Sequence, residues 1–288
     1  MREEGSVIRF LFEGLDVRGV WVRLSGAWQH MREGRGYGPA ESGLLGEMAA
    51  VTALIGAQLK QPGRLTLQLR GAGPVSRLVV DCVDCAGELH LRGMATARPD
   101  LLPAPLPQLL GDGQLLLSLD LPGARLPYQS LVPLAGDSVA ALFAHYLEQS
   151  EQQLAFLLAA ADETTAACFF LQKLPDADAK DPDGWQRLTQ LARTAQSGEL
   201  LGLALEPLLQ RLFPEEIEQR GIRIFPPRPV LWHCPEDRGK VANMLRALGR
   251  EEAESILAEH GEIRVRDDLC NREYCFDAQD VETLFPPK

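Results

Sequence analysis

Leu231-Trp232-His233-Cys234 and, farther along the chain, Asp267-Asp268-Leu269-Cys270-Asn271-Arg272-Glu273-Tyr274-Cys275 are the two stretches that decide how this sequence is interpreted. They hold three of the six cysteines. In small metal-binding modules a hairpin turn presents closely spaced cysteines, because two thiolates can then converge on one tetrahedral ion. One of the sulfurs that such a turn would need is missing here.

The segment between the two stretches has the pattern of a small folded module. Glu236 to Glu259 reads as two short helices broken at Gly249, and Gly261 to Arg266 reads as a strand that enters a turn. Asn271 follows Cys270 at a place where such turns commonly need a left-handed backbone, which Asn tolerates. We therefore expect a hairpin packed on two helices.

Composition sets the outer limits of the interpretation. A chain of 288 residues with 45% hydrophobic residues predicts two or three units with ample cores. The net charge of −11 disfavours nucleic-acid binding, because a phosphate backbone would be repelled. Met1 to Glu4 are charged and precede no apolar segment of the kind that secretory signals need, and the run near Leu154 to Ala161 is too short to cross a bilayer. We expect a soluble cytoplasmic protein without a membrane partner.

Residues 1–175 predict a domain of antiparallel strands and helices. Alternating apolar residues such as Leu65, Leu67 and Leu69 indicate strands with one buried face. Gly71-Ala72-Gly73 is followed by Pro74 and a β-branched segment, so it predicts a turn and not a nucleotide-binding loop. The strands are expected at 7–12, 17–24, 65–69, 79–80, 89–91, 115–121, 131–134, 154–159 and 168–174, and the helices at 25–33, 42–59 and 138–149.

Residues 176–229 predict a helical linker region. The charged stretch Asp176 to Gly184 marks its start, and Pro226 to Pro229 form a semi-rigid end. Between them lie two apolar stripes, one through Trp185 and Leu188 and one through Leu205 and Leu208. Two such helices cannot bury both stripes between themselves, so they must pack on a neighbouring domain.

The chain resembles one known family over its whole length. The cysteine stretches, the two helices ending in Ser255 to Ile263 and the final Tyr274 and Phe276 are similar to the bacterial thirty-three-kilodalton heat shock proteins, a family of redox-regulated holdase chaperones. Further matching residues recur in order: Val17-Arg18-Gly19, Tyr37-Gly38-Pro39, Leu44-Leu45-Gly46-Glu47, Leu59-Lys60, Gly63, Gln68, Gly71-Ala72-Gly73-Pro74, Arg92-Gly93, Gly111-Asp112-Gly113, Tyr128-Gln129 and Leu147-Glu148-Gln149-Ser150-Glu151.

The resemblance implies an α+β fold of three parts. Residues 1–175 would form a client-binding and dimerisation domain, 176–229 a linker region that covers the client surface, and 230–288 a zinc-knuckle-like module that acts as a redox switch. It also implies that unfolded client proteins are the partners, that a homodimer can form, and that ATP is not needed. The expected function is therefore that of a holdase and not of an enzyme.

The family's zinc site is degenerate here. Its pattern, Cys-x-Cys followed by Cys-x-x-Cys, falls on Trp232, Cys234, Asp267 and Cys270, so two thiolate ligands are lost. We expect no bound zinc, with Trp232 adding apolar surface to the first knuckle instead. The alternative is a zinc ion held by Cys234 and Cys270 with help from His233, Asp267 or Cys275. Alternation along the strand predicts that Cys275 faces away from Tyr274 and Phe276.

The family's two local disulfides cannot form, because each pair keeps one cysteine. The redox switch is then either lost or rerouted through Cys234 and Cys270, which the resemblance places at former ligands of one ion. Two outcomes stay open at this point: a disulfide between these cysteines, or two separate thiols kept apart by Trp232.

Other candidate sites predict little chemistry. Cys82 and Cys85 have redox spacing, but we interpret them as incidental residues of a hairpin turn. Cys168 reads as a core residue, and His30, His90 and His145 as isolated. The alternatives to a holdase are a thiol-disulfide oxidoreductase centred on Cys82 and Cys85, and a regulatory protein-binding module.

Overall fold

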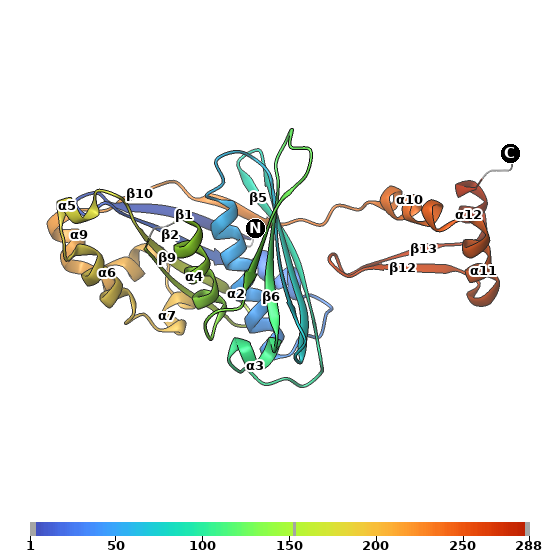
Figure 1. The fold of residues 1–288 in the computed structure, drawn as a ribbon, viewed down its shortest axis with the longest axis horizontal. Coiled ribbons are helices and arrows are strands. Elements are labelled where there is room, and N and C mark those ends of the chain that lie inside the picture. Colours follow the sequence, from blue (N-terminus) through green and yellow to red (C-terminus); the bar gives the residue numbers. More distant parts are fainter. Residues whose placement is uncertain (1–3, 152–153, 286–288) are drawn as a thin grey trace. The chain divides into compact units, whose positions relative to one another are not determined.

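The computed structural model describes residues 4–151 and 154–285, and it forms two compact units, Met1–His233 and Cys234–Lys288 (Figure 1). The first unit contains an eleven-stranded sheet. Its strands are β1 Gly5–Phe12, β2 Val17–Leu24, β3 Arg64–Gly71, β4 Val75–Cys85, β5 Glu88–Ala97, β6 Gly113–Asp120, β7 Tyr128–Pro133, β8 Ala155–Ala161, β9 Ala166–Lys173, β10 Arg223–Ile224 and β11 Arg228–Trp232.

The helices of the first unit include one long central helix and several short ones. They are α1 Gly26–Arg32, α2 Pro39–Gly56, α3 Leu106–Leu110, α4 Val139–Glu151, α5 Ala177–Lys180, α6 Gly184–Ala192, α7 Ser197–Gly202, α8 Leu205–Leu212 and α9 Pro214–Arg220. The mixed α+β class expected from the sequence is confirmed. Helix α2 begins earlier than predicted, because Pro39 occupies its first turn, where a missing N–H costs nothing, and it ends earlier, at Gly56.

One short strand, β11, joins two halves of the sheet. The strand order is β7-β6-β3-β4-β5-β11-β1-β2-β9-β8, with β10 paired to β1. Strand β11 runs parallel to β5, with Val230 opposite Leu89, and antiparallel to β1, with Val7 opposite Arg228. The sequence predicts a connection into the C-terminal module here, and that prediction is wrong. Its valine and aromatic side chains fit a half-buried pleated surface instead.

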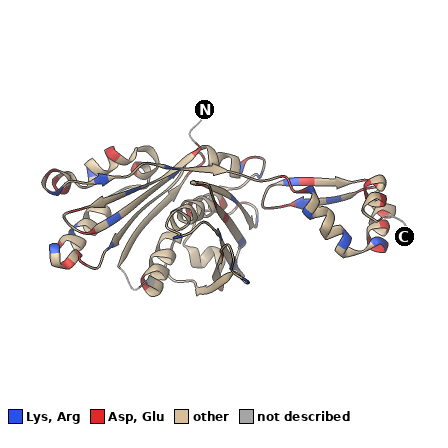
Figure 2. Cartoon of the chain, turned by 90° about the horizontal axis from the view of Figure 1, so that it is seen from above, with Lys and Arg blue, Asp and Glu red and all other residues tan. Residues whose placement is uncertain are grey.

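The main core lies between α2 and the sheet. Small residues let α2 approach its neighbours closely: a Cβ on Gly46 would stand only 2.4 Å from the Cβ of Ala161. Leu45, Met48 and Leu54 of this helix are fully buried. The charged residues that Figure 2 colours blue and red are few on the central helix and frequent on the outlying ones.

The helices of the predicted linker region pack on the opposite face of β1, β2 and β9. Leu188, Leu205 and Leu208 are buried in a second core with Phe10, Phe12 and Phe169. The prediction that the two apolar stripes need a neighbouring domain is thus confirmed. An ion cluster also links α6 to α9: Arg187 Nη2 lies 2.9 Å from Asp181 Oδ2 and its Nε donates to the buried Glu216. Burial of the stripes and this cluster hold the region on the sheet.

The second unit is a hairpin packed on helices. It contains α10 Arg238–Leu248, α11 Arg250–His260, the strands β12 Ile263–Asp267 and β13 Arg272–Phe276, and α12 Ala278–Leu284. The two helices separate at Gly249, whose φ of 101° suits glycine, so the predicted break is confirmed. Leu245, Ile263 and Phe276 form the centre of its small core.

Candidate functional site

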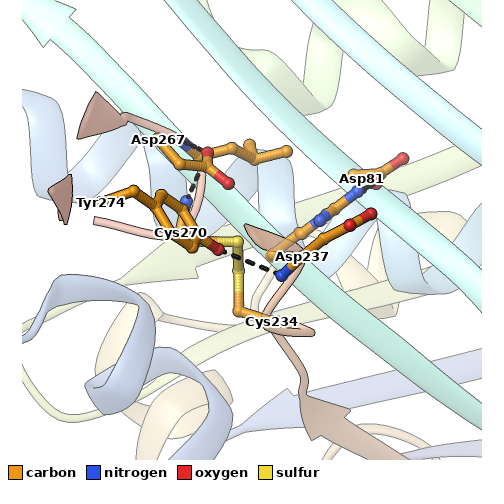
Figure 3. The surroundings of a disulfide bond; sticks show 8 residues. Asp81, Cys234, Asp237, Asp267, Cys270 and Tyr274 are labelled. Atoms are coloured by element: carbon orange, nitrogen blue, oxygen red, sulfur yellow. Dashed lines mark hydrogen bonds and ion pairs between the residues drawn. A yellow bond between two sulfur atoms is a disulfide. The ribbon is translucent and has the colours of Figure 1, made fainter. Parts of the chain in front are cut away.

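The candidate site is the turn of the β12–β13 hairpin and the chain that enters α10. Cys234 precedes α10, and Cys270 lies in the turn; both are buried. A disulfide joins their sulfurs, with the two Cα atoms 5.6 Å apart (Figure 3). This separation lies within the range that disulfides span without backbone distortion. The bond closes a loop whose ends are 36 residues apart in the sequence.

Asp267 shapes the turn that carries Cys270. Its Oδ1 accepts hydrogen bonds from the backbone N–H groups of Leu269, at 3.0 Å, and of Cys270, at 3.2 Å (Figure 3). Asn271 then adopts a φ of 50°, the left-handed conformation expected from the sequence. The carboxylate therefore does in this turn what side chains of Asp and Asn do in many tight turns: it replaces a backbone acceptor.

Tyr274 connects the hairpin to the entry of α10. Its hydroxyl accepts a hydrogen bond from the backbone N–H of Asp237 at 3.2 Å, and its ring is buried in the core of the module (Figure 3). Asp237 in turn caps α10, because its Oδ1 accepts from the N–H of Lys240 at 2.8 Å. The disulfide and this hydrogen bond thus tie the same two segments together.

Cys275 lies on the opposite side of β13 from the core. It is exposed, whereas Tyr274 and Phe276 on either side of it are only 4% and 2% exposed. Its backbone pairs with Arg264 across the hairpin. This thiol is therefore accessible to solvent, and alternation along the strand accounts for that.

Trp232 and His233 belong to the first unit, whose boundary falls before Cys234. The indole of Trp232 packs against the main core, with its ring centre 5.7 Å from that of His30. The expectation that Trp232 fills the first knuckle is wrong, because β11 places it on the sheet. The N–H of His233 donates to Leu91 O at 3.0 Å.

His90 and His233 form a ring pair that the sequence did not indicate. Their ring centres are 4.6 Å apart, and Nε2 of His90 lies 3.7 Å from Oε2 of Glu88. The pairing follows from the parallel register of β11 with β5. The sequence predicted an isolated His90, because no local sequence pattern indicates that β5 and β11, which lie far apart in the chain, pair with each other.

The donors at the four expected metal positions do not fit a tetrahedral zinc ion in this geometry. The two sulfurs are bonded to each other, the Asp267 Oδ1 receives two N–H groups, and an indole offers no ligand. Within residues 4–151 and 154–285, no three His, Cys, Asp or Glu side chains gather in a way that could hold a metal.

Two of the other thiols, those of Cys82 and Cys168, are unsuited to exchange chemistry. Cys82 and Cys85 lie within β4 and not in the turn expected for them. Burial raises the pKa of the Cys82 thiol to about 12, so little of the reactive thiolate is present near neutral pH. Burial also raises the pKa of Cys168, whose sulfur lies 3.4 Å from Ala50 O. Both residues act as small core side chains.

No helix among the described residues has the length and apolar character that crossing a membrane requires.

Comparison with known proteins gives a consistent result. The profile of the family described as Hsp33 protein matches residues 5–277. A 33 kDa chaperonin of Methylobacillus flagellatus is 39% identical over 279 residues, which are 96% of this chain and 93% of that protein. A 33 kDa chaperonin of Chromobacterium violaceum is 39% identical over 290 residues, covering 99% and 95%.

A solved structure shares the fold. The crystal structure of a 33 kDa chaperonin from Thermotoga maritima superposes with a TM-score of 0.79, covers 97% of both chains and is 23% identical.

Proposed function

This chain belongs to the Hsp33 protein family, and from that premise we propose that it is an ATP-independent holdase chaperone whose redox switch has been reduced to one disulfide. Its partners are unfolding proteins, which it holds through apolar surface without chemical turnover. The family resemblance supports this role, and so do relatives named 33 kDa chaperonin. It works as a cytoplasmic protein, not as an enzyme, and it can form homodimers.

The observation that carries the proposal is the disulfide between Cys234 and Cys270. Two residues aligned with zinc ligands of the family are bonded to each other, while the other two are Trp232 and Asp267. The reduced protein accordingly holds no zinc, because two thiolates and weak oxygen donors lose metal to thiolate-rich sites elsewhere in the cell. The small apolar core around Leu245, Ile263 and Phe276 supports folding of the module without metal.

The effect of oxidation on the second unit is opposite to the one that the family resemblance implies. Formation of the bond removes two electrons and two protons from the thiols, and a peroxide accepts them as it becomes water. The product is a cross-linked module with less conformational freedom in its unfolded state. Oxidation therefore tightens this end of the chain, whereas release of zinc would loosen it.

The client surface is the apolar face that α6, α7 and α8 cover. Phe10, Phe12 and Phe169 line that face and would become exposed if these helices lifted. An exposed aromatic surface of this kind binds apolar segments of unfolding proteins. The ion cluster of Arg187, Asp181 and Glu216 opposes such a movement.

The thiol oxidoreductase alternative has no support from Cys82, because its raised pKa disfavours the thiolate that attacks disulfides.

The test is a client-aggregation assay with the intact protein in both redox states. Light scattering of a thermally unfolding client should be suppressed by reduced and oxidised protein alike. Cys234→Ser should retain suppression under both conditions, and Cys275→Ser serves as the matched control for loss of a thiol. Suppression that appears only after combined peroxide and heat treatment would show that the family's switch has survived, and absence of suppression in every state would refute the holdase function.

A further inference from the structure

The two ends of the large sheet are protected very differently. At one end, β8 contacts α4 and α7, and its Phe156, Leu157 and Ala160 are at most 8% exposed. At the other end lies β7, which pairs only with β6. Among the described residues no further strand pairs with its outer edge, and the green hairpin that joins β6 to β7 stands clear of the labelled helices (Figure 1).

An uncovered edge strand exposes backbone groups that can pair with another chain. Every second residue of β7 directs its N–H and C=O away from β6, because antiparallel pairing uses only one side of the strand. Val132 is buried in the main core and fixes the strand in its register with Leu115. The free edge is therefore held in a fixed register with β6.

The side chains of this edge lack the features that usually prevent pairing. Natural edge strands carry charged residues, above all lysine, to keep other chains away. Here residues 126–136 contain no charged side chain, while Leu126, Tyr128 and Leu131 are 81%, 61% and 61% exposed. The inner strands show the opposite pattern, since Arg64, Asp81 and Arg92 lie within them.

We propose that β7 is a second client-binding element, which captures an extended, uncharged segment of an unfolding protein by adding it to the sheet as a further strand. This inference rests on the proposed holdase function and adds to it the class of segment that is bound. Main-chain hydrogen bonds supply affinity for any sequence, while Leu131 and Tyr128 favour apolar neighbours on the two faces of the sheet. Segments of about six or seven uncharged β-prone residues are also those that aggregate most readily.

A client segment fits this edge better than a second copy of the chain. Strand β7 has six residues and ends at Pro133, which has no N–H to donate. A two-fold contact confined to such an edge falls short of the roughly 1,200 Å² that specific stable interfaces bury. Weak, reversible pairing suits a holdase, because clients must be released for refolding.

The experiment measures binding of a fluorescein-labelled, uncharged heptapeptide of Val, Thr and Tyr to the full-length protein. Hydrogen exchange should show new protection of the amides of Tyr128–Val132 when the peptide binds. Leu131→Lys should weaken binding of the peptide by about tenfold or more. Strand addition would then place apolar side chains of the peptide against the lysine ammonium group, which would have to give up its hydration. Leu102→Lys is the matched control, since Leu102 is 78% exposed and lies outside the strand; it should bind as the unchanged protein does.

Three results would overturn the inference: protection elsewhere in the sheet without protection of β7, equal affinity of Leu131→Lys and the unchanged protein, or a dimer in sedimentation that Leu131→Lys dissociates. Circular dichroism checks that both variants are folded. The client-aggregation assay tests the proposed function separately. Suppression by the unchanged protein without peptide protection at β7 rejects this inference alone, and protection at β7 without suppression rejects the holdase function together with the client role of β7.

Discussion

Glu47 lies in the buried helix α2, where its charge is disfavoured. Burial raises the pKa of its carboxyl group from 4.5 to about 7. The folded state therefore holds a proton that the unfolded state releases at lower pH. Since the folded pKa is the higher one, the protein loses stability through this group as pH rises from about 4.5 to about 7, and the full penalty remains above that range.

Glu47→Gln removes this titration at nearly constant shape. We predict that the variant unfolds in urea with a free energy higher than the unchanged protein by about 2 to 3 kcal/mol at pH 8, and by much less at pH 4.5. Glu206→Gln, an exposed glutamate of helix α8, is the control and should change stability little at either pH. If Glu47→Gln raised the free energy of unfolding equally at both pH values, the charge of the Glu47 carboxylate would not be the cause.

The Cys234–Cys270 bond should govern the stability of the second unit. In the chain-entropy description, a cross-link between residues 36 apart stabilises the fold by about 4 kcal/mol. We predict that Cys270→Ser, compared with the oxidised protein, raises amide exchange throughout β12 and β13, while amides of α2 are unaffected. Cys275→Ser is the control, since its exposed thiol takes part in no cross-link. Unchanged exchange in Cys270→Ser would mean that the apolar core alone holds the module.

At the scale of elements, β11 is the strand on which the continuity of the sheet depends. Val230 is fully buried between the two halves that β11 joins. Val230→Ala removes two methyl groups from this seam. We predict that the free energy of unfolding of the first unit falls by about 1 to 3 kcal/mol, as measured by tryptophan fluorescence. Val265→Ala makes the same chemical change in the second unit, whose described residues include no tryptophan, so it should leave that signal unchanged. A larger effect of Val265→Ala would contradict the role of β11.

The sequence predicted those elements whose signals are local. Gly249 correctly predicted the boundary between the two helices of the second unit, because glycine favours a break. The alternation of Leu65, Leu67 and Leu69 correctly predicted strand β3. It failed at β11, because a strand of five residues between prolines and a cysteine reads as a connection. As a result, Trp232 was assigned to the C-terminal module, although it lies in the first unit. Parallel pairing with β5 depends on contacts distant in sequence, which no local pattern encodes.

The candidate site was predictable only in part. The spacing of Cys234 and Cys270 gained its meaning from the family resemblance, and the residues alone left the disulfide and the separate thiols equally open. The turn function of Asp267 is visible in its hydrogen bonds to Leu269 and Cys270. A carboxylate two and three residues before its N–H donors is a familiar turn signal, so the sequence could have suggested it.

At the scale of the whole molecule, the chain is a holdase whose second unit is organised by a disulfide and an apolar core. We propose that the family's zinc-bound, reduced resting state has no counterpart in this chain. The covered aromatic face lies in the first unit and the disulfide lies in the second, so we expect that client binding does not await oxidation.

Native mass spectrometry of the intact protein tests this central claim most directly, because one spectrum reports both bound metal and cross-linking. The protein should be prepared under reducing conditions with zinc supplied, and then again after mild oxidation. The account predicts the metal-free mass in the first spectrum and a mass lower by two hydrogen atoms in the second, with peptide mapping that joins Cys234 to Cys270. A reduced protein that carries one zinc ion per chain, lost in the Cys234→Ser variant, would contradict it.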